Sequence, residues 1–173
     1  MLQQESSELY RYTSTFAALS AFVFSAPEAV PLCSRVAATV SVTGLADRSP
    51  RALADGEQLS LGRHAVQWFD TPHVPHGWDC GVLFDGSTGT LLCGDLFTQP
   101  GAEMPPVTET EVLSASEAMR GMMDYYAHAT KTAAILEGLA ALKPSTLACQ
   151  HGSAYRGDGA ALLRELTARV ERG

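Results

Sequence analysis

The chain has 173 residues, of which 46% are apolar and 18% are charged, with 12 Lys and Arg against 19 Asp and Glu. This is enough apolar sequence for one hydrophobic core, and it excludes a disordered tail, a collagen-like repeat and a mini-protein held by disulfides. The formal net charge of −7 repels phosphate backbones, so nucleic acid is not an expected partner. The four cysteines show no C-x-x-C spacing, which argues against a zinc ribbon or a redox dithiol and favours a reduced compartment.

One apolar run near the N-terminus has some features of a targeting signal. Phe16–Val23, FAALSAFV, is too short to span a bilayer. The residues before it carry Glu5 and Glu8 against the single Arg11, where a secretory signal needs positive charge. We therefore expect a short buried helix over residues 16–24 and a cytoplasmic protein without a membrane segment.

The next segments are short and mixed in character. Cys33–Val42, CSRVAATVSV, fits either a helix or a strand, because its periodicity does not decide between them. Residues 46–51, ADRSPR, are polar and predict a loop. The pair Asp55 and Gly56 predicts a tight turn that leads into residues 58–61.

Strand signals follow from residue 65. Ala65–Phe69, AVQWF, is rich in β-branched and aromatic residues and predicts a strand that ends at Asp70. The runs CGVLF and TLLCG are separated by DGSTG, and this pattern predicts a β-hairpin over residues 80–94. Between them lies the irregular stretch TPHVPHGWD, in which we expect Pro72 and Pro75 to hold the backbone extended and rigid.

Helical patterns dominate the remainder. Ser114 and Glu117 have capping-box spacing and predict the start of a helix that continues through Tyr126. Three further elements follow in chain order: a helix at about 131–142, a strand at 146–149 and an amphipathic helix at 160–170. Asp158 is the expected N-cap of the last helix. A cluster with helical spacing on the first helix indicates packing in the core or an interface rather than a cofactor site: Met119, Met122, Met123, Tyr125 and Tyr126.

Polar residues that could bind a metal ion or take part in catalysis follow three of the predicted strands. Asp95 follows the apolar run TLLCG, where a carboxylate needs a partner such as a metal ion. His151 follows TLAC in the same way, and Gly152 lets the chain turn away. His73 and His76 follow the first strand. The pattern alone equally allows a structural interpretation, in which Asp95 caps a turn, His151 bonds a backbone carbonyl and the two other histidines lie in a stiff surface loop.

Two runs together carry a resemblance to a known family. Asp70–Phe97, DTPHVPHGWDCGVLFDGSTGTLLCGDLF, and Leu147–Tyr155, LACQHGSAY, resemble the metallo-β-lactamase superfamily and, within it, the oxygen-binding diiron and flavodiiron branch. The resemblance implies an α+β fold, the metallo-β-lactamase-type αββα sandwich, incomplete at the N-terminal side. It implies one domain over residues 1–173, in which 51–173 is family-like and 1–50 is atypical or truncated.

The resemblance also implies a metal site. Metal ligands are expected at His73, Asp95 and His151, with Asp95 as the carboxylate that bridges two metals, and His76 and Asp79 are further candidates. The metal is iron or zinc, and the partner is dioxygen or a small-molecule substrate. No catalytic residue is assigned by the resemblance.

The chain departs from the family in its N-terminal part. The signature H-x-H-x-D-H, or H-x-E-x-D in the diiron branch, is missing, since no histidine precedes His64 and residues 11–28 have no acidic residue before Glu28. We therefore expect one metal ion rather than an intact two-metal centre, with weak or no catalysis of hydrolase or diiron oxidoreductase type. Missing strands would expose a sheet edge, which predicts a homo-oligomer. The alternative is a non-catalytic truncated relative that serves as a structural or partner-binding domain.

Overall fold

A computed structural model of the chain describes residues 30–42, 49–101 and 103–172. The helix expected over residues 16–24 lies outside these ranges. The chain divides into two compact units, Met1–Leu53 and Ala54–Gly173. Every helix within the described ranges is too short or too polar to cross a membrane.

The described part of the first unit is a two-stranded parallel sheet with a helical connection. Its elements are β1 (Leu32–Ser34), α3 (Arg35–Ala37), the π-helical η2 (Ala38–Val42) and β2 (Arg51–Leu53). The Ser34 hydroxyl accepts a hydrogen bond from the Ala37 N–H at 3.0 Å and starts α3. Cys33–Val42, whose sequence fitted either a helix or a strand, is therefore mostly helical. The predicted loop over 46–51 is wrong at its end, because Arg51 already belongs to β2.

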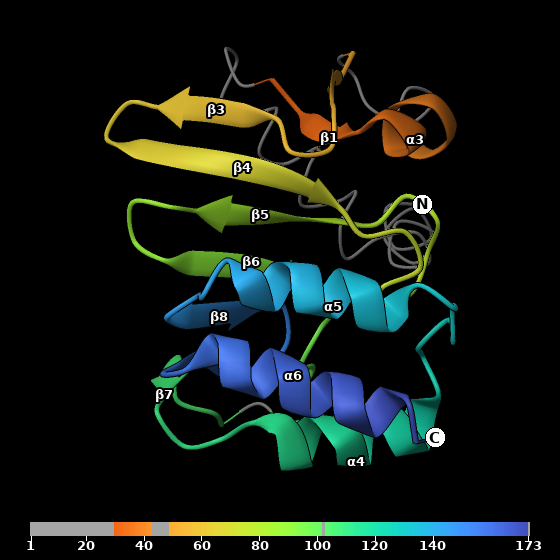
Figure 1. The fold of residues 1–173 in the computed structure, drawn as a ribbon, viewed down its shortest axis with the longest axis vertical. Helices are drawn as coiled ribbons and strands as arrows, with labels where there is room; N and C mark the ends of the chain where they lie inside the picture. Colours follow the sequence, from red (N-terminus) through yellow and green to blue (C-terminus); the bar gives the residue numbers. More distant parts are fainter. Residues whose placement is uncertain (1–29, 43–48, 102, 173) are drawn as a thin grey trace, which may run out of the picture. The chain divides into compact units, whose positions relative to one another are not determined.

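The second unit is built on a seven-stranded mixed sheet with the strand order β3-β4-β5-β6-β8-β9-β7 (Figure 1). The strands are β3 (Gln58–Leu61), β4 (His64–Asp70), β5 (Gly81–Asp85), β6 (Thr90–Gly94), β7 (Val107–Thr108), β8 (Thr146–Cys149) and β9 (Ala154–Arg156). The strands from β3 to β6 pair antiparallel in sequence order. This confirms the predicted turn before residue 58, the strand that ends at Asp70 and the hairpin. β6 then pairs with β8 in parallel.

The helices described in this unit are α4 (Leu113–Met123), α5 (Thr132–Ala141) and α6 (Gly159–Val170). In Figure 1, α4 lies at the β7 end of the sheet, and α5 and α6 run side by side over one face. The last two confirm the predicted helices, and Asp158 is the N-cap of α6, accepting from the Ala161 N–H at 2.9 Å. Leucines from α5, α6 and the central strands form the core, each 2% exposed or less: Leu91, Leu136, Leu139, Leu147, Leu163 and Leu166.

The start and end of α4 differ from the prediction. The capping box at Ser114 is wrong, because Ser114 already lies inside the helix. Its N–H donates instead to the Glu111 carboxylate at 3.1 Å, so an acidic residue before the helix takes the capping role. The helix ends at Met123, earlier than expected, since Asp124 adopts a left-handed conformation with φ 44°.

The segment between β4 and β5 is folded into turns and is not extended as predicted. The Thr71 N–H donates to the Cys80 carbonyl at 2.9 Å, and the His73 N–H donates to the Gly77 carbonyl at 2.7 Å. His73 has a φ of 65°, in the left-handed region. These hydrogen bonds close the segment into a compact loop, which we call the 71–80 loop.

A buried carboxylate organises the turn of the β5–β6 hairpin. Asp85 is 8% exposed. It accepts hydrogen bonds from His64 Nδ1 at 2.7 Å, from the Thr88 hydroxyl at 2.9 Å and from the Ser87 N–H at 2.9 Å. Burial opposes ionisation, but these hydrogen bonds outweigh it and lower the pKa of Asp85 to about 2.

Replacing Asp85 with Asn should destabilise the protein at neutral pH. Because the folded-state pKa of Asp85 lies below its ordinary value of 3.8, the stabilisation is complete above about pH 4 and is lost as pH falls toward 2. Asp85→Asn should therefore unfold at lower urea concentration at pH 7 and lose less stability than the parent between pH 4 and pH 2. Asp124→Asn, which removes an exposed carboxylate paired with His128, is the control. Identical pH profiles for the parent and Asp85→Asn would contradict this assignment.

Candidate metal centre

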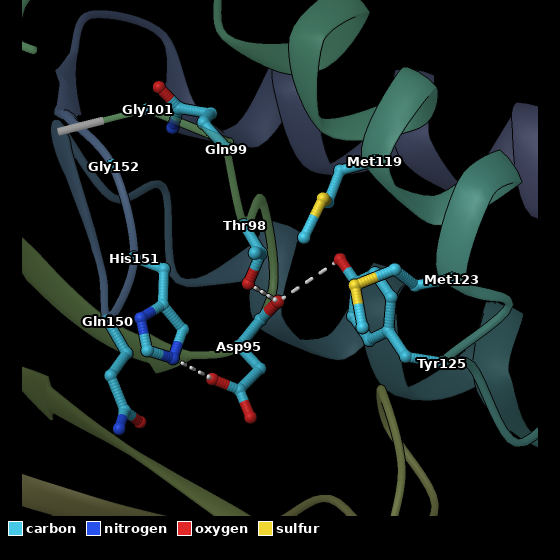
Figure 2. Close-up of a pocket in the computed structure, with 10 residues that line it drawn as sticks. All are labelled: Asp95, Thr98, Gln99, Gly101, Met119, Met123, Tyr125, Gln150, His151 and Gly152. Atoms are coloured by element: carbon cyan, nitrogen blue, oxygen red, sulfur yellow. Dashed lines mark hydrogen bonds and ion pairs between the residues drawn. The ribbon is translucent and has the colours of Figure 1, made fainter. Parts of the chain in front are cut away.

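The parallel pairing of β6 and β8 brings Asp95 and His151 to the same edge of the sheet. Each residue follows the carboxyl end of its strand, and the Gln150 N–H donates to the Gly94 carbonyl at 2.8 Å, which ties the two ends together. His151 Nε2 lies 3.5 Å from Asp95 Oδ1 (Figure 2). Two of the residues expected from the sequence therefore meet in space.

The 71–80 loop supplies a second imidazole to the same carboxylate. His76 Nε2 lies 3.0 Å from Asp95 Oδ2. The loop is held in place on both sides of His76, since the Ala127 N–H donates to the Pro75 carbonyl at 2.8 Å and the Cys80 thiol donates to the His76 carbonyl. His76, first considered only as a further candidate, therefore contacts Asp95 directly.

The other two expected ligands occupy different positions in this loop. His73 is exposed, and its side chain makes no hydrogen bond or ion pair with any residue that the structure describes. Asp79 is half-buried, and its carboxylate lies beside Gly77. A Cβ added to Gly77 would lie 3.2 Å from the Oδ1 of Asp79. The ion pairs of Asp95 are with His76 and His151, so these three side chains form the cluster.

The Asp95 carboxylate has one oxygen without a hydrogen-bond donor. Its side chain is 30% exposed, yet Oδ1 is buried, and the 3.5 Å separation from His151 Nε2 is too long for a hydrogen bond. A buried acceptor without a donor is costly, and such a group calls for a ligand, an ion or water. Among the described residues, no three His, Cys, Asp or Glu side chains converge on a common point as a metal site would require. The imidazoles turn instead onto the carboxylate itself.

Two neutral donors lie next to the cluster. Burial, then the carboxylate of Asp79, raises the pKa of the Cys80 thiol, and Asp95 adds to this effect. Burial likewise raises the pKa of Tyr125. Both groups are therefore protonated at neutral pH. Tyr125 donates to the Asp95 backbone carbonyl at 3.4 Å, and its ring packs edge-on against His76.

A cavity of about 530 Å³ opens beside Asp95 and His151 (Figure 2). Its lining residues are Asp95, Thr98, Gln99, Gly101, Met119, Met123, Tyr125, Gln150, His151 and Gly152. The prediction that the methionine and tyrosine cluster is core packing holds for Tyr126, which is 4% exposed. Met122 and Met123 are 74% and 60% exposed and lie outside the core, so for them only the interface alternative stays open as a prediction. The face of α4 that carries Met119 and Met123 turns to the cavity.

Gln99 holds the segment that carries His151, and no sequence motif pointed to it. Its side chain is 3% exposed and donates to the Phe97 carbonyl at 3.0 Å and the Ser153 carbonyl at 3.1 Å, while the backbone N–H of Gln99 donates to the His151 carbonyl at 3.1 Å. Gly152 has a φ of 99°, and a Cβ there would lie 2.7 Å from the Gln99 Cβ. The lack of a side chain at position 152 therefore lets Gln99 pack against this turn.

Comparison with known proteins identifies the fold. No protein-family model and no curated protein matches the chain. Solved structures do match: rubredoxin oxygen:oxidoreductase from the anaerobe Desulfovibrio gigas is 24% identical over 90% of this chain, with a TM-score of 0.73. The metal-soaked Flv1 flavodiiron core from Synechocystis sp. PCC6803 is 24% identical over 91%, with a TM-score of 0.72. The flavodiiron protein from Giardia intestinalis is 16% identical over 90%, with a TM-score of 0.73.

The chain therefore has the mixed α+β, metallo-β-lactamase-like fold of the flavodiiron core, as the resemblance predicted. It spans only part of those proteins, since the match covers 41%, 39% and 39% of their respective chains. At these identities the likeness establishes the fold alone.

Replacing Gln99 with Ala should release His151 from its position. The change removes the side-chain partner of the Ser153 N–H and leaves the Ser153 carbonyl with the Cys149 thiol as its side-chain donor, which should cost about 1–3 kcal/mol of unfolding free energy. We expect the imidazole resonances of His151 to shift or broaden in NMR spectra, and Gln99→Glu not to restore them, because a carboxylate cannot donate to the two carbonyls. Gln150→Ala removes an exposed amide from the same turn and is the control. Unchanged His151 resonances in Gln99→Ala would show that Gln99 does not position this side chain.

Proposed function

We propose that this chain is a metalloprotein of the metallo-β-lactamase fold that binds iron through His76, Asp95 and His151. The observation that carries the proposal is a carboxylate flanked by two imidazole Nε2 atoms, with one oxygen buried and without a hydrogen-bond donor. Such an oxygen is the kind of group that a cation satisfies.

The donor separations support a metal-binding role. Ligands about 2.0–2.2 Å from one ion lie about 3.0–3.5 Å from each other when they are neighbours in its coordination sphere. The two nitrogen–oxygen separations, 3.0 and 3.5 Å, fall in this range. Two imidazoles and one carboxylate form a donor set that suits iron(II) and leaves open positions for an outside ligand.

The contacts also allow Asp95 to serve two ions. His76 approaches Oδ2 and His151 approaches Oδ1, so each oxygen of the carboxylate has its own imidazole. Three side chains do not complete two coordination spheres, so we propose one ion. Because the three side chains do not converge on one point in this structure, its binding would require an imidazole to rotate. His73, Asp79 and Cys80, in the loop that carries His76, are the nearest further candidates for a ligand.

The names of the similar structures favour iron over zinc, since they describe flavodiiron proteins and an oxygen oxidoreductase. Iron with open positions supplies a place where dioxygen binds. The residues of this chain would orient that ligand, because Asp95 and His151 face the cavity and Tyr125 closes its other side (Figure 2). Hydrolase chemistry, which the resemblance also implied, finds no support in these comparisons.

Metal analysis tests the proposal directly. Protein prepared without chelator and loaded anaerobically with iron(II) should hold about one ion per chain. The double variant Asp95→Ala, His151→Ala should lower the affinity by at least about tenfold. The matched control removes the His128 and Asp124 pair, an exposed imidazole and carboxylate 2.8 Å apart, and should leave iron binding unchanged. Iron content unaffected by the Asp95 and His151 changes would refute the proposed site.

Single-histidine variants test which residue of the 71–80 loop binds. His76→Ala should weaken iron binding strongly and His73→Ala only slightly, because His76 alone of the two contacts Asp95. Thermal denaturation provides a second measure, since iron at 100 times its Kd should raise stability by about 2.7 kcal/mol. The reverse order would favour the sequence-based choice of His73. No stabilisation by iron in the parent would favour the non-catalytic alternative, and preferential zinc binding would contradict the choice of metal.

The oligomeric state and the location remain predictions. Within the described sheet β3 lies at one end of the strand order, and Leu61 on it is 57% exposed, which supports self-association through this edge. We propose a cytoplasmic homo-oligomer on this basis together with the reduced cysteines. Light scattering that gives the mass of a single chain would contradict the oligomer.

A further inference from the structure

The cavity beside Asp95 and His151 has the size and wall of a site for a small organic molecule. Its volume of about 530 Å³ falls within the range of about 300–1,000 Å³ that such sites occupy. Met119 and Met123 on α4, with Tyr125 just after it, face across the space toward Asp95 (Figure 2). Thioether and phenol side chains adapt to flat or irregular apolar shapes. This wall therefore suits the apolar body of a ligand.

The opposite wall offers few unused hydrogen-bonding groups. The Thr98 hydroxyl donates to the Asp95 carbonyl at 2.8 Å, and the Gln99 amide is engaged with the Phe97 and Ser153 carbonyls. Gln150 differs from both, because its side chain is exposed and makes no hydrogen bond to any residue that the structure describes. Its amide can both donate to a ligand and accept from it.

Charge narrows the class of ligand further. Among the residues that the structure describes, the lining includes one carboxylate, Asp95, and no Lys or Arg. An anion would give up its hydration without meeting a side-chain cation, in a protein of net charge −7. An organic ammonium group is bulkier than a metal ion, and it would have to push His76 or His151 aside to reach the carboxylate, since an imidazole lies against each oxygen.

We propose that this cavity binds an uncharged organic molecule with an apolar, ring-sized body that packs on Met119, Met123 and Tyr125. The polar end of the molecule hydrogen-bonds to the Gln150 amide. Its role as a substrate rests on the proposed metal function, because the cavity opens directly onto Asp95 and His151. The binding itself depends only on the lining residues and is tested without metal.

Three isosteric probes separate the charge classes. Benzamide, benzoate and benzylammonium are titrated into chelator-treated, metal-free full-length protein that carries ¹³C-methyl methionine. Benzamide should shift the methyl signals of Met119 and Met123, with a Kd on the order of millimolar, as expected for so small a ligand. The signal of Met122, which is 74% exposed and does not line the cavity, should stay unchanged. Benzoate and benzylammonium should bind at least tenfold more weakly.

Matched variants locate the binding. Met119→Glu should abolish the benzamide shift, whereas Met122→Glu, the same change on the exposed side of α4, should not. Gln150→Lys should raise the affinity for benzoate, because it adds the missing cation at an exposed position, and this gain cannot arise from unfolding.

The proposal is overturned if no probe shifts the Met119 and Met123 signals, or if benzoate or benzylammonium binds as tightly as benzamide to the parent protein. Its failure is distinct from that of the metal site. Iron binding without benzamide binding refutes the ligand class alone. Benzamide binding without iron binding refutes the metal function and leaves the cavity as an organic-ligand site.

Discussion

The position of the site depends on the parallel pairing of β6 with β8. Two parallel neighbours end at the same edge of a sheet, so the residues that follow them, Asp95 and His151, meet although they are distant in sequence. Antiparallel pairing would have put the ends of these strands at opposite edges. Parallel pairing also requires a long crossover, and here the crossover contains α4 and α5. The same connection therefore supplies Met119 and Met123 to the cavity wall.

The helices and strands that could be predicted are those that the spacing of nearby apolar and turn residues determines. The β5–β6 hairpin followed from two apolar runs around a turn, and α5 and α6 followed from apolar residues at helical spacing. β7 and β9 were missed because strands of two and three residues are too short to show alternation and exist only through their partners. The start of α4 was misassigned because Glu111, before the helix, does what the pattern attributed to Ser114.

The site was predictable to the extent that strand ends are visible in a sequence. Asp95 and His151 each follow an apolar run, and that signal put each at a strand end, while the structure shows that these two ends lie at one edge. The resemblance favoured His73 and gave His76 only as a further candidate, and both follow a proline in the same segment. In the structure the Ala127 N–H holds the Pro75 carbonyl, and His76 rather than His73 contacts Asp95. The role of Gln99 could not be predicted, since a buried side-chain amide that hydrogen-bonds to backbone groups leaves no sequence motif.

The apolar core of the second unit is formed by the sheet and its helices, and it includes neither Asp95 nor the two histidines. With the imidazoles resting on the carboxylate, the fold does not need a cation to hold these side chains together. In a zinc finger, by contrast, the ligands assemble only around the ion, and the empty chain is unfolded. For the present chain, an ion bound as proposed would join side chains that the fold already holds, so folding and metal loading would be separate events.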